Sequence, residues 1–433
     1  MADTIHGEIG AHPADWSIQR VDSLFDIQQG KSVSKAHREG NNQKPFLRTK
    51  NILWGQIDFT ELDEMHFTSA EEVRLKLQAG DLLLCEGGDV GRTAIWKDQM
   101  EACYYQNHLH RLRARAVNEV DPQFALFWFW YAFEVGNIYI GRSNVTTIPN
   151  LSQSKLSELL IPKPQVDEQR RIAHVLATVN TAIEQQMRLI AVTRELKSAL
   201  MRKLFTEGLR GEKQRETEIG LIPESWKVVE LNNVSEKPQY GFTESAQDKG
   251  TAQFLRITDI QEFGVNWSDV PYCECPENLI DKYLLKNGDL VFARIGATTG
   301  KSVVMNNPPK AVFASYLIRI RPYSEGLDSD FLAFYCQTQQ YWQQIDSHKG
   351  NNLKGGVNSG ILQKLLVPLP KTDEQQEISQ VLTALDSRID LARKRVLLHE
   401  DLFRTLLHQL MTGQTRVNKL DFGAFEARTI RGE

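Results

Sequence analysis

Two stretches of the chain are copies of one another and decide the fold. The first, LLIPKPQVDEQRRIAHVLATVNTAIEQ, covers residues 159–185, and the second, LLVPLPKTDEQQEISQVLTALDSRIDL, covers residues 365–391. They lie 206 residues apart, and the register continues without a gap to Leu204 in the first copy and Leu410 in the second. A repeat on this scale indicates a chain built twice to one plan, with each copy supplying one structural unit.

Each copy contains a long amphipathic helix. From residue 172 in the first copy and residue 378 in the second, apolar side chains recur at intervals of three and four residues, which is the helical period. A helix of about forty residues extends about 60 Å, and a single apolar stripe of that length is not stable alone in water. We therefore expect the two helices to pair antiparallel as a coiled-coil spacer.

The sequence also marks the ends of both helices. Prolines at 162, 164, 368 and 370 prevent helical backbone before the helices begin. Gly208 and Gly413 are predicted stops, because glycine readily adopts the left-handed conformation that ends a helix. Asp167 and Asp373 are predicted N-caps, and the acidic residues after them favour the first turn. The residues predicted to start and orient the spacer are Asp167, Glu168, Gln169, Asp373, Glu374 and Gln375.

The segments before the helices match as well. They contain short runs with period-two alternation, glycine-rich turns and one or two helices, at 121–135 in the first copy and 329–345 in the second. The fold class predicted from this pattern is α+β, with two α+β domains separated by the two long helices in a pseudo-two-fold internal repeat. The paired phrases are EIGAHPADW (8–16) with EIGLIPESW (218–226), FLRTKNI (46–52) with FLRITDI (254–260), AGDLLLCEGGDVGRT (79–93) with NGDLVFARIGATTGKS (287–302), and HLHRLRAR (108–115) with YLIRIRPY (316–323).

The composition is that of a globular protein without a membrane segment, with 41% hydrophobic and 24% charged residues. The most apolar run, 124–133, falls short of the roughly 20 residues that a membrane span requires, and the N-terminus lacks the features of a signal peptide. The five cysteines form neither a paired zinc motif nor a disulfide framework, so we expect a cytoplasmic protein without a metal site. With a net charge of −4, DNA binding would depend on local basic patches.

No enzymatic motif is complete. RIGATTGKS (294–302) resembles a phosphate-binding loop, but it is one residue short and is followed by a strand-like run instead of a helix. Its counterpart, EGGDVGRT (86–93), lacks the motif altogether, so both are interpreted as glycine-rich turns between strands. NNPPK (306–310) resembles the catalytic loop of adenine-specific methyltransferases, but Lys310 occupies the aromatic position and no cofactor-binding glycine motif precedes it. We predict no catalytic residues in this chain.

Basic, polar loops recur at matched positions and indicate binding instead. Residues 30–51 carry six Lys or Arg residues against one acidic residue. Residues 141–147 and 348–356 are rich in Asn, Gly and cations, and they stand at corresponding places before the two helices. Cations together with Asn, Ser and Thr are the groups that contact phosphates and base edges in DNA. A basic loop can also be merely solvated, but its recurrence in both copies favours binding.

Taken in order, these features resemble one family. Two differing α+β domains alternate with two repeated helices; each helix is opened by P-x-P-x-x-D-E-Q, and each half of the chain by I-G-x-x-P-x-x-W. This arrangement resembles the specificity subunit of type I restriction–modification systems over nearly the whole chain. The resemblance implies a first target recognition domain at 1–158, a spacer helix at 159–210, a second target recognition domain at 211–364, a second spacer helix at 365–415 and a C-terminal tail at 416–433.

The resemblance also implies a function and a set of partners. Each domain would read one half of a bipartite double-stranded DNA target, and the helices would set the gap between the halves. Two methylation subunits would dock on the helices, and restriction subunits would then join. This chain would hold no cofactor, whereas S-adenosylmethionine, ATP and Mg²⁺ would serve partner subunits with adenine methyltransferase and ATP-dependent endonuclease activity. The alternatives are a coiled-coil scaffold without DNA specificity and a fused adenine methyltransferase or NTPase.

The recognition pattern of the family falls on loops in both copies. Side chains differ between the copies there while the scaffold around them matches, as expected for two readers of unlike half-sites. One departure is QYGFTESA (239–246), which lacks the Gly-Lys-Ser of 30–32 and with it the predicted phosphate-binding lysine. In the first copy the predicted DNA-binding residues are Lys31, Ser32, Lys35, Arg48, Lys50, Asn51, Arg92, Thr93, Arg142, Asn144 and Thr146. In the second copy they are Thr243, Arg256, Thr258, Arg294, Thr298, Thr299, Lys301, Lys349, Asn351, Asn352 and Lys354.

Overall fold

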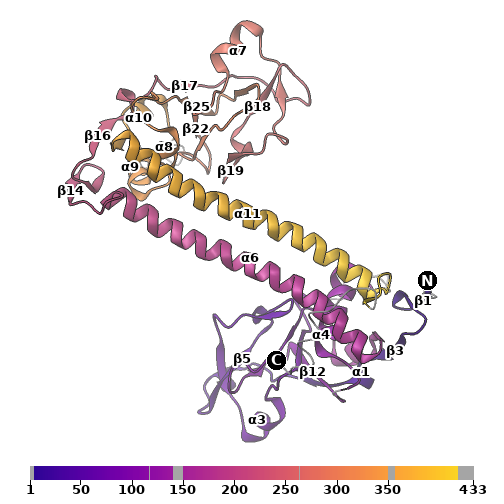
Figure 1. The fold of residues 1–433 in the computed structure, drawn as a ribbon. Helices are drawn as coiled ribbons and strands as arrows, with labels where there is room; N and C mark the ends of the chain where they lie inside the picture. The colour runs from indigo at the N-terminus through magenta and orange to yellow at the C-terminus, as the bar shows by residue number, and fades with distance from the viewer. Residues whose placement is uncertain (1–3, 117, 140–149, 263, 350–355, 418–433) are drawn as a thin grey trace. The chain divides into compact units, whose positions relative to one another are not determined.

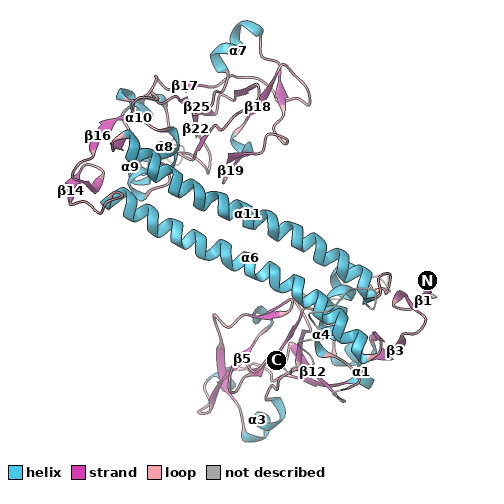
Figure 2. Cartoon of the chain, in the orientation of Figure 1, coloured by secondary structure: helices cyan, strands magenta, loops and turns pink. Residues whose placement is uncertain are grey.

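A computed structural model describes residues 4–116, 118–139, 150–262, 264–349 and 356–417. The chain divides into two compact units, the first comprising Met1–Gln185 and Val396–Glu433 and the second Gln186–Arg395. Helix α6 (Val166–Glu207) and helix α11 (Thr372–Met411) (Figure 1, Figure 2) are each shared by the two units, with the boundary after Gln185 in α6 and after Arg395 in α11. The sequence-based division keeps each long helix as a segment of its own, whereas the compact units share both helices.

Each unit is built on a four-stranded antiparallel sheet. In the first unit its strands are β4 (Phe25–Gln29), β9 (Leu82–Cys85), β10 (Thr93–Ile95) and β12 (Leu109–Ala114), and in the second they are β17 (Gln239–Tyr240), β22 (Leu290–Ala293), β23 (Ser302–Val304) and β25 (Leu317–Ile320). The spatial orders are β10-β9-β12-β4 and β23-β22-β25-β17, so the same connections occur twice. The strands β9 and β22 are continuous apolar runs because both of their faces are buried.

A three-stranded sheet packs against the first sheet in each unit. Its strands are β5 (Gln43–Leu47), β8 (Asp63–His66) and β11 (Tyr104–Tyr105) in the first unit, and β18 (Ala252–Leu255), β21 (Tyr272–Cys273) and β24 (Ala311–Phe313) in the second. The middle strand pairs in parallel with β11 or β24 and antiparallel with β8 or β21. Side chains of β5, β9 and β11 share one buried cluster, which holds the two sheets of the first unit together.

Three two-stranded ladders complete each unit and again occur in matched pairs. They are β1 (Thr4–Gly7) with β2 (Gly10–Pro13) and β14 (Gln214–Thr217) with β15 (Gly220–Pro223); β3 (Ser17–Arg20) with β13 (Leu160–Lys163) and β16 (Lys227–Glu230) with β26 (Leu366–Leu369); and β6 (Ile52–Leu53) with β7 (Gln56–Ile57) and β19 (Ile260–Gln261) with β20 (Gly264–Val265). This agreement at every ladder confirms the predicted repeat of one α+β plan.

Short helices join the strands. They are α1 (Val21–Leu24), α2 (Lys35–Arg38), α3 (Ser69–Leu75), α4 (Pro122–Trp130) and α5 (Gln153–Glu158) in the first unit, and α7 (Glu277–Tyr283), α8 (Ser329–Tyr335), α9 (Gln339–Lys349) and α10 (Ser359–Gln363) in the second. Short turns of other helical types are η1 (Thr49–Asn51), η2 (Tyr131–Val135), η3 (Leu231–Asn233) and η4 (Ile257–Asp259). The predicted helix at 121–135 is confirmed as α4 with η2.

The segment predicted to be helical at 329–345 is helical but divided, because the structure has two helices there, α8 and α9. The break lies at Thr338. Its hydroxyl donates to the carbonyl of Tyr335 at 2.7 Å and accepts from the amide of Tyr341 at 3.3 Å. The threonine side chain thereby ends one helix and starts the next, which is a known competition between side chain and backbone.

Helices α4 and α8 form the centre of each core. Helix α4 is apolar on all sides and is buried over Phe124–Phe129, so it lies between other layers instead of at the surface. It packs with residues of both long helices, including Ile172 of α6 and Leu407 of α11. In the second unit α8 packs with Phe205 of α6 and Ile378 of α11. Each end of the long helices is therefore part of a globular core.

The long helices start earlier than the sequence predicts. Asp167 and Asp373 are the second residues of α6 and α11, not their N-caps, and the prediction was wrong on this point. The reason is that the carbonyl groups of Gln165 and Lys371 already accept the first helical hydrogen bonds. Both acidic side chains still lie in the first turn, where they oppose the positive end of the helix dipole.

The glutamine of the P-x-P-x-x-D-E-Q phrase has the same structural role in both copies. Gln169 and Gln375 are fully buried. Each accepts one backbone N–H and donates to two backbone carbonyls, so each ties the start of a long helix to the segment that leads into α4 or α8. The partners of Gln169 are the amide of Asp121 (2.8 Å) and the carbonyls of Glu119 (3.1 Å) and Pro164 (2.8 Å); those of Gln375 are the amide of Asp328 (2.8 Å) and the carbonyls of Gly326 (3.0 Å) and Pro370 (3.0 Å).

The glutamate before each glutamine joins the helix to the opening phrase of the same unit. Glu168 accepts from the indole N–H of Trp16 at 3.2 Å, and Glu374 accepts from that of Trp226 at 3.1 Å. Both indoles are buried, and a buried N–H without a partner is costly. These bonds explain why the I-G-x-x-P-x-x-W phrase recurs together with the D-E-Q phrase.

Within each unit the two helix halves run antiparallel. In the first unit Arg416, which follows α11, contacts Glu168 at the start of α6 at 2.8 Å. In the second unit the amide of Leu209, which follows α6, donates to Glu374 at the start of α11 at 3.2 Å. Gly208 directly follows α6 in the left-handed conformation, with φ +67°, as predicted. The second unit is one continuous stretch of chain, whereas the first combines both ends.

Three further features concern the described part of the chain. None of its helices is both long enough and apolar enough to cross a membrane. All five cysteines are buried and unpaired. Within the described ranges no group of three or more His, Cys, Asp or Glu residues is placed to hold a metal ion.

Candidate DNA interface

Loops from four places in the sequence meet at one edge of the sheets in the first unit. They are residues 30–32 after β4, 48–51 after β5, 86–92 between β9 and β10, and 106–108 before β12. Backbone hydrogen bonds join the loops and their flanking strands: the amide of Lys31 donates to Tyr105 (3.0 Å), that of Gln106 to Leu47 (3.0 Å), and that of Glu86 to His108 (2.9 Å). The loops thus rest on one another through main-chain contacts that do not depend on side-chain identity.

The second unit repeats this framework bond for bond. Its loops are residues 241–243, 256–259, 294–301 and 314–316. The matched bonds run from the amide of Phe242 to Phe313 (2.7 Å), from that of Ala314 to Leu255 (2.9 Å), and from that of Arg294 to Tyr316 (3.0 Å). One backbone frame therefore carries two sets of side chains.

A glycine in each unit permits the closest approach within this frame. A Cβ atom at Gly30 would lie 2.3 Å from the carbonyl oxygen of Gln106, and one at Gly241 would lie 2.2 Å from that of Ala314. Real Cβ atoms do not approach oxygen this closely, so only glycine fits. The Gly-Lys-Ser and Gly-Phe-Thr phrases are thus equivalent in structure.

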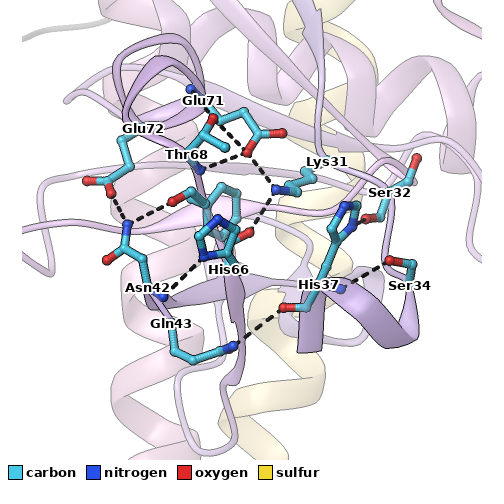
Figure 3. A network of polar contacts seen from close by, with 11 residues as sticks. Lys31, Ser32, Ser34, His37, Asn42, Gln43, His66, Thr68, Glu71 and Glu72 are labelled. Carbon is cyan, nitrogen blue, oxygen red and sulfur yellow. Dashed lines mark hydrogen bonds and ion pairs between the residues drawn. The ribbon is translucent and has the colours of Figure 1, made fainter. Parts of the chain in front are cut away.

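Lys31, predicted to contact DNA, is buried instead. Its side chain is 6% exposed, and its Nζ donates to Glu71 at 2.6 Å and to the carbonyl of His66 at 2.8 Å (Figure 3). The ammonium group also lies 5.2 Å from the ring centroid of Phe67. Burial raises the pKa of Glu71, but hydrogen bonds from Lys31 and Thr68 outweigh burial and lower that pKa to about 2. The structure contradicts a phosphate contact for Lys31.

The second unit shows why a lysine is not required at this position. Phe242 takes the equivalent place, and its ring centroid lies 5.4 Å from that of Tyr283. Lys31 and Phe242 make the same parallel bridge, to Gln106 and Ala314 respectively. The position is part of the core, which either a paired cation or an aromatic ring can fill.

The network around Lys31 also holds the loop that carries exposed cations (Figure 3). Asn42 donates from its side chain to the carbonyl of Phe67 at 2.7 Å, and from its backbone to Nδ1 of His66 at 3.1 Å. Both ends of the loop are therefore fixed to β8 and the residue after it. Lys35 and Arg38 of α2 project from this loop and are exposed, Lys35 by 90%.

Lys31→Ala is expected to lower the stability of the protein, whereas Lys35→Ala is expected to weaken DNA binding. The first leaves Glu71 and a carbonyl without their partner, and should lower the free energy of unfolding by about 1–3 kcal/mol. That contribution is present above pH 4.5 and lost as the pH falls toward 2, because the pKa of Glu71 is lowered in the folded state. Lys35→Ala should leave stability unchanged and reduce the slope of log affinity against log salt by about one. Thermal unfolding and DNA titrations at several salt concentrations measure both effects for each variant. A stable Lys31→Ala variant with a lowered salt slope, beside a destabilised Lys35→Ala variant, would show that Lys31 contacts DNA and Lys35 stabilises the fold.

Asn51 is a second predicted DNA contact that is structural. It is 2% exposed, its Oδ1 accepts from the amide of Arg48 at 2.9 Å, and its Nδ2 donates to two backbone carbonyls of the loop that follows. Asp259 makes the same bond to the amide of Arg256 at 2.8 Å. Both side chains cap η1 or η4. The structure therefore contradicts base contact by Asn51.

Two predicted threonines are structural as well. Thr93 is fully buried and donates to the carbonyl of Gly91 at 2.7 Å. Thr299 is 6% exposed and donates to the carbonyl of Gly296 at 2.7 Å. Because each hydroxyl stabilises its own glycine turn, neither is free to contact DNA.

Arg92 and Lys301 brace the two glycine turns against the neighbouring turns. Arg92 donates from Nη2 to the carbonyl of Thr49 at 2.9 Å, and Lys301 donates from Nζ to the carbonyl of Ile260 at 3.3 Å. The two cations thus contact the same turn at different points, Arg92 at the start of η1 and Lys301 just after η4, and Arg92 also pairs with Asp89. The helix that a phosphate-binding loop requires is absent, since β23 follows Lys301 directly. A DNA contact by either cation stays a prediction.

The other predicted residues keep exposed or partly exposed surface within the described part. Arg48 pairs with Asp63 at 2.8 Å and Lys50 with Glu61 at 2.9 Å, so these two cations are partly neutralised. The accessible predicted residues are Ser32, Lys35, Arg48, Lys50, Thr243, Arg256, Thr258, Arg294 and Thr298. Arg142, Asn144, Thr146, Asn351, Asn352 and Lys354 lie outside the described residues, as does the side chain of Lys349.

One anchoring position was missed by sequence reasoning. Trp54, in the β6–β7 turn, stacks on Trp130 of α4 with ring centroids 5.4 Å apart. Glu262, in the β19–β20 turn, pairs with Arg194 of α6 at 3.1 Å and Arg393 of α11 at 2.6 Å. The turn after the FLR phrase therefore docks on the helical layer in both units, by stacking in one and by charge in the other. The differing residue types left no pattern to find.

The sequence of the chain matches that of a known protein family in two places. The family model described as type I restriction modification DNA specificity domain matches residues 13–194 and again residues 223–397. The chain belongs to this family. Each match includes the recognition loops and the first part of a long helix, so the family domain coincides with the internal repeat.

Individual members of the family resemble the chain over nearly its whole length. The putative type I restriction enzyme MjaX specificity subunit of Methanocaldococcus jannaschii is 26% identical over 425 residues, which cover 95% of this chain and 96% of that protein. The EcoKI specificity subunit of Escherichia coli K12 is 22% identical and covers 89% and 85%. The crystal structure of the type I restriction–modification S subunit from M. genitalium superposes with a TM-score of 0.62 at 17% identity, covering 91% and 96%.

The family predicted from the sequence is therefore confirmed. Membership favours a DNA specificity subunit over a coiled-coil scaffold and over a fused methyltransferase or NTPase. The S-subunit structure adds that the fold is shared at low sequence identity.

Proposed function

We propose that this chain is the DNA specificity subunit of a type I restriction–modification complex, with each unit reading one half of a bipartite duplex target. The observation that carries the proposal is the duplicated loop frame, in which three matched backbone hydrogen bonds support different exposed side chains. Ser32 and Lys50 project from the first frame, and Thr243 and Thr258 from the second. A fixed support with two sets of polar side chains is what two readers of unlike sequences require.

The long helices support a role in assembly and spacing. The helical layer of each unit carries exposed apolar side chains, and contiguous apolar surfaces commonly mark sites for other proteins. They are Leu397, Leu398 and Leu402 in the first unit, and Met187, Val192, Leu196, Val381 and Leu391 in the second. We assign these faces to two methylation subunits, with restriction subunits joining the complex, and we assign the gap between half-sites to the helices as a spacer. S-adenosylmethionine, ATP and Mg²⁺ would be held by those partners, which would supply the chemistry.

Exchange of one recognition domain tests the proposal. Replacing residues 1–158 with the same domain of another family member should change one half of the methylated sequence and leave the other half and the gap unchanged, because both helices are retained. Replacing residues 211–364 is the matched control and should change the opposite half. Sequencing of methylated bases in cells carrying each chain gives the answer. A change in both halves after a single exchange is incompatible with two independent readers.

A further inference from the structure

Both central sheets present three side chains at the ends of neighbouring strands, which we call the strand-end triads. They are Gln29 at the end of β4, Glu86 after β9 and His108 before β12, matched by Tyr240 at the end of β17, Arg294 after β22 and Tyr316 before β25. The backbone around them is equivalent. The carbonyl of residue 86 accepts from the amide of residue 151 at 2.8 Å, and that of residue 294 accepts from the amide of residue 357 at 2.9 Å.

In the second unit the triad is basic and aromatic. The guanidinium carbon of Arg294 lies 5.0 Å from the ring centroid of Tyr240, a cation–π contact that orients the planar group. Tyr240 is itself fixed, because its hydroxyl accepts from the amide of Ser359 at 3.0 Å. Tyr316 is 57% exposed, and among the described residues no carboxylate pairs with Arg294. The donors of Arg294 are therefore held in place without being neutralised.

In the first unit the same three positions hold an amide, a carboxylate and an imidazole. Glu86 accepts from Nε2 of Gln29 at 3.2 Å, and its carboxylate lies 3.7 Å from Nδ1 of His108. Gln29 is fixed by a second bond, to the carbonyl of Asn107 at 2.9 Å. The side chain of Glu86 is 9% exposed and that of His108 58%, so the carboxylate lies just beneath an exposed imidazole. Within the described part of the chain no lysine or arginine pairs with Glu86.

The opposite charges at one matched position need an explanation. The cations that brace the two glycine turns keep their charge in both units, since Arg92 and Lys301 each donate to the turn after the FLR phrase. Residues 86 and 294 share their backbone bonds, yet one is a carboxylate and the other a guanidinium. An internal brace would need an opposite charge beside each of them; among the described residues no carboxylate pairs with Arg294, and Glu86 has only the imidazole of His108, 3.7 Å away. A ligand that differs between the units accounts for both.

We propose that the strand-end triads read bases of opposite hydrogen-bonding character in the two half-sites; this inference rests on the proposed function. Arg294 matches the O6 and N7 acceptors of guanine, which a guanidinium contacts with two donors. Glu86 matches the N4 amino group of cytosine, which donates to a carboxylate. The half-site of the second unit then requires a guanine, and the half-site of the first unit requires a cytosine.

The test uses the full chain assembled with its methylation subunits. Purified complexes carrying Arg294→Ala, Arg294→Lys or Glu86→Gln select duplexes from a pool randomised in both half-sites, and the methylated motif is read in cells carrying the same variants. Arg294→Ala should lower the preference for guanine at one position by roughly 5- to 150-fold and leave the other half unchanged. Arg294→Lys keeps the charge but loses the planar fork, so it should lower the same preference less. Glu86→Gln should shift a cytosine in the other half toward adenine, which an amide contacts with two bonds.

Lys227→Ala is the matched control. Lys227 is exposed on β16, away from the loop frame, and its loss removes one positive charge. The selected motif should not change. Retention of the wild-type guanine and cytosine preferences in the Arg294 and Glu86 variants overturns the inference. So does an equal loss of affinity for all duplexes with a salt slope lowered by about one, since that result assigns a phosphate contact. If the unaltered complex selects no bipartite motif, the proposed function itself is wrong.

Discussion

A chain with Gln375→Ala is expected to lose about 2–5 kcal/mol from the free energy of unfolding of its second unit. The substitution leaves three buried backbone groups without a partner, namely the amide of Asp328 and the carbonyls of Gly326 and Pro370. An unsatisfied buried polar group costs about 1–3 kcal/mol, and partial relaxation keeps the total below the simple sum. Hydrogen exchange resolved along the chain measures the change unit by unit.

Gln376→Ala is the control for this result. Gln376 is the next residue of α11 and is exposed, so its substitution should change the free energy of unfolding by no more than about 0.5 kcal/mol. Gln169→Ala should reproduce the effect of Gln375→Ala in the first unit, because Gln169 makes the same three bonds. Equal loss of protection in the Gln375 and Gln376 variants would refute the clamp assigned to the buried glutamine.

Gly30→Ala is expected to be the most damaging small substitution in the recognition loops of the first unit. The added methyl group would lie 2.3 Å from the carbonyl oxygens of both Tyr105 and Gln106. The loop must move away, which breaks the bond from the amide of Lys31 to Tyr105. We expect a loss of at least about 2 kcal/mol in the free energy of unfolding, together with lost specificity for one half-site only.

Gly87→Ala provides the comparison within the same unit. No atom lies within 4 Å of a Cβ placed there, and the residue does not need the left-handed conformation. Its stability should be unchanged or slightly raised, because alanine restricts the unfolded chain more than glycine does. Thermal unfolding of both variants, with the motif selected by each complex, separates a clash from a general effect of losing glycine. Similar stability of the two variants would contradict the proposed close approach.

The sequence predicts the architecture well because its patterns are long and repeated. The three-and-four spacing from residue 172 and from residue 378 continues for many turns, so α6 and α11 could be placed to within a few residues. Their first residues could not be placed, because Asp167 is a favoured N-cap residue type, whereas in the structure the carbonyl of Gln165 accepts the first helical hydrogen bonds. The break at Thr338 was likewise invisible, since one hydroxyl decides it.

The candidate site was only partly predictable for a related reason. Residue type shows that Lys31 is cationic, but not that Glu71, forty residues later, lies 2.6 Å from it. The sequence offered one indication, which is that Phe242 stands at the matched position of the second copy. A phenyl ring cannot donate a hydrogen bond to a phosphate. Exposed loop cations such as Lys35 were easier to predict, because a charged side chain in a polar segment is usually exposed to solvent.

The division of the chain has a consequence for biosynthesis. Residues Gln186–Arg395 of the second unit are synthesised as one stretch, so the core of this unit needs no residue that is made after Arg395. The first unit begins earlier but cannot finish, since Phe403 and Leu407 of its core belong to the last part of the chain. Until Phe403 and Leu407 have been synthesised, the apolar side chains of α4 cannot pack against α11. The N-terminal domain is therefore the last to mature, and a nascent chain halted after Arg395 would expose an unfinished core to chaperones and proteases.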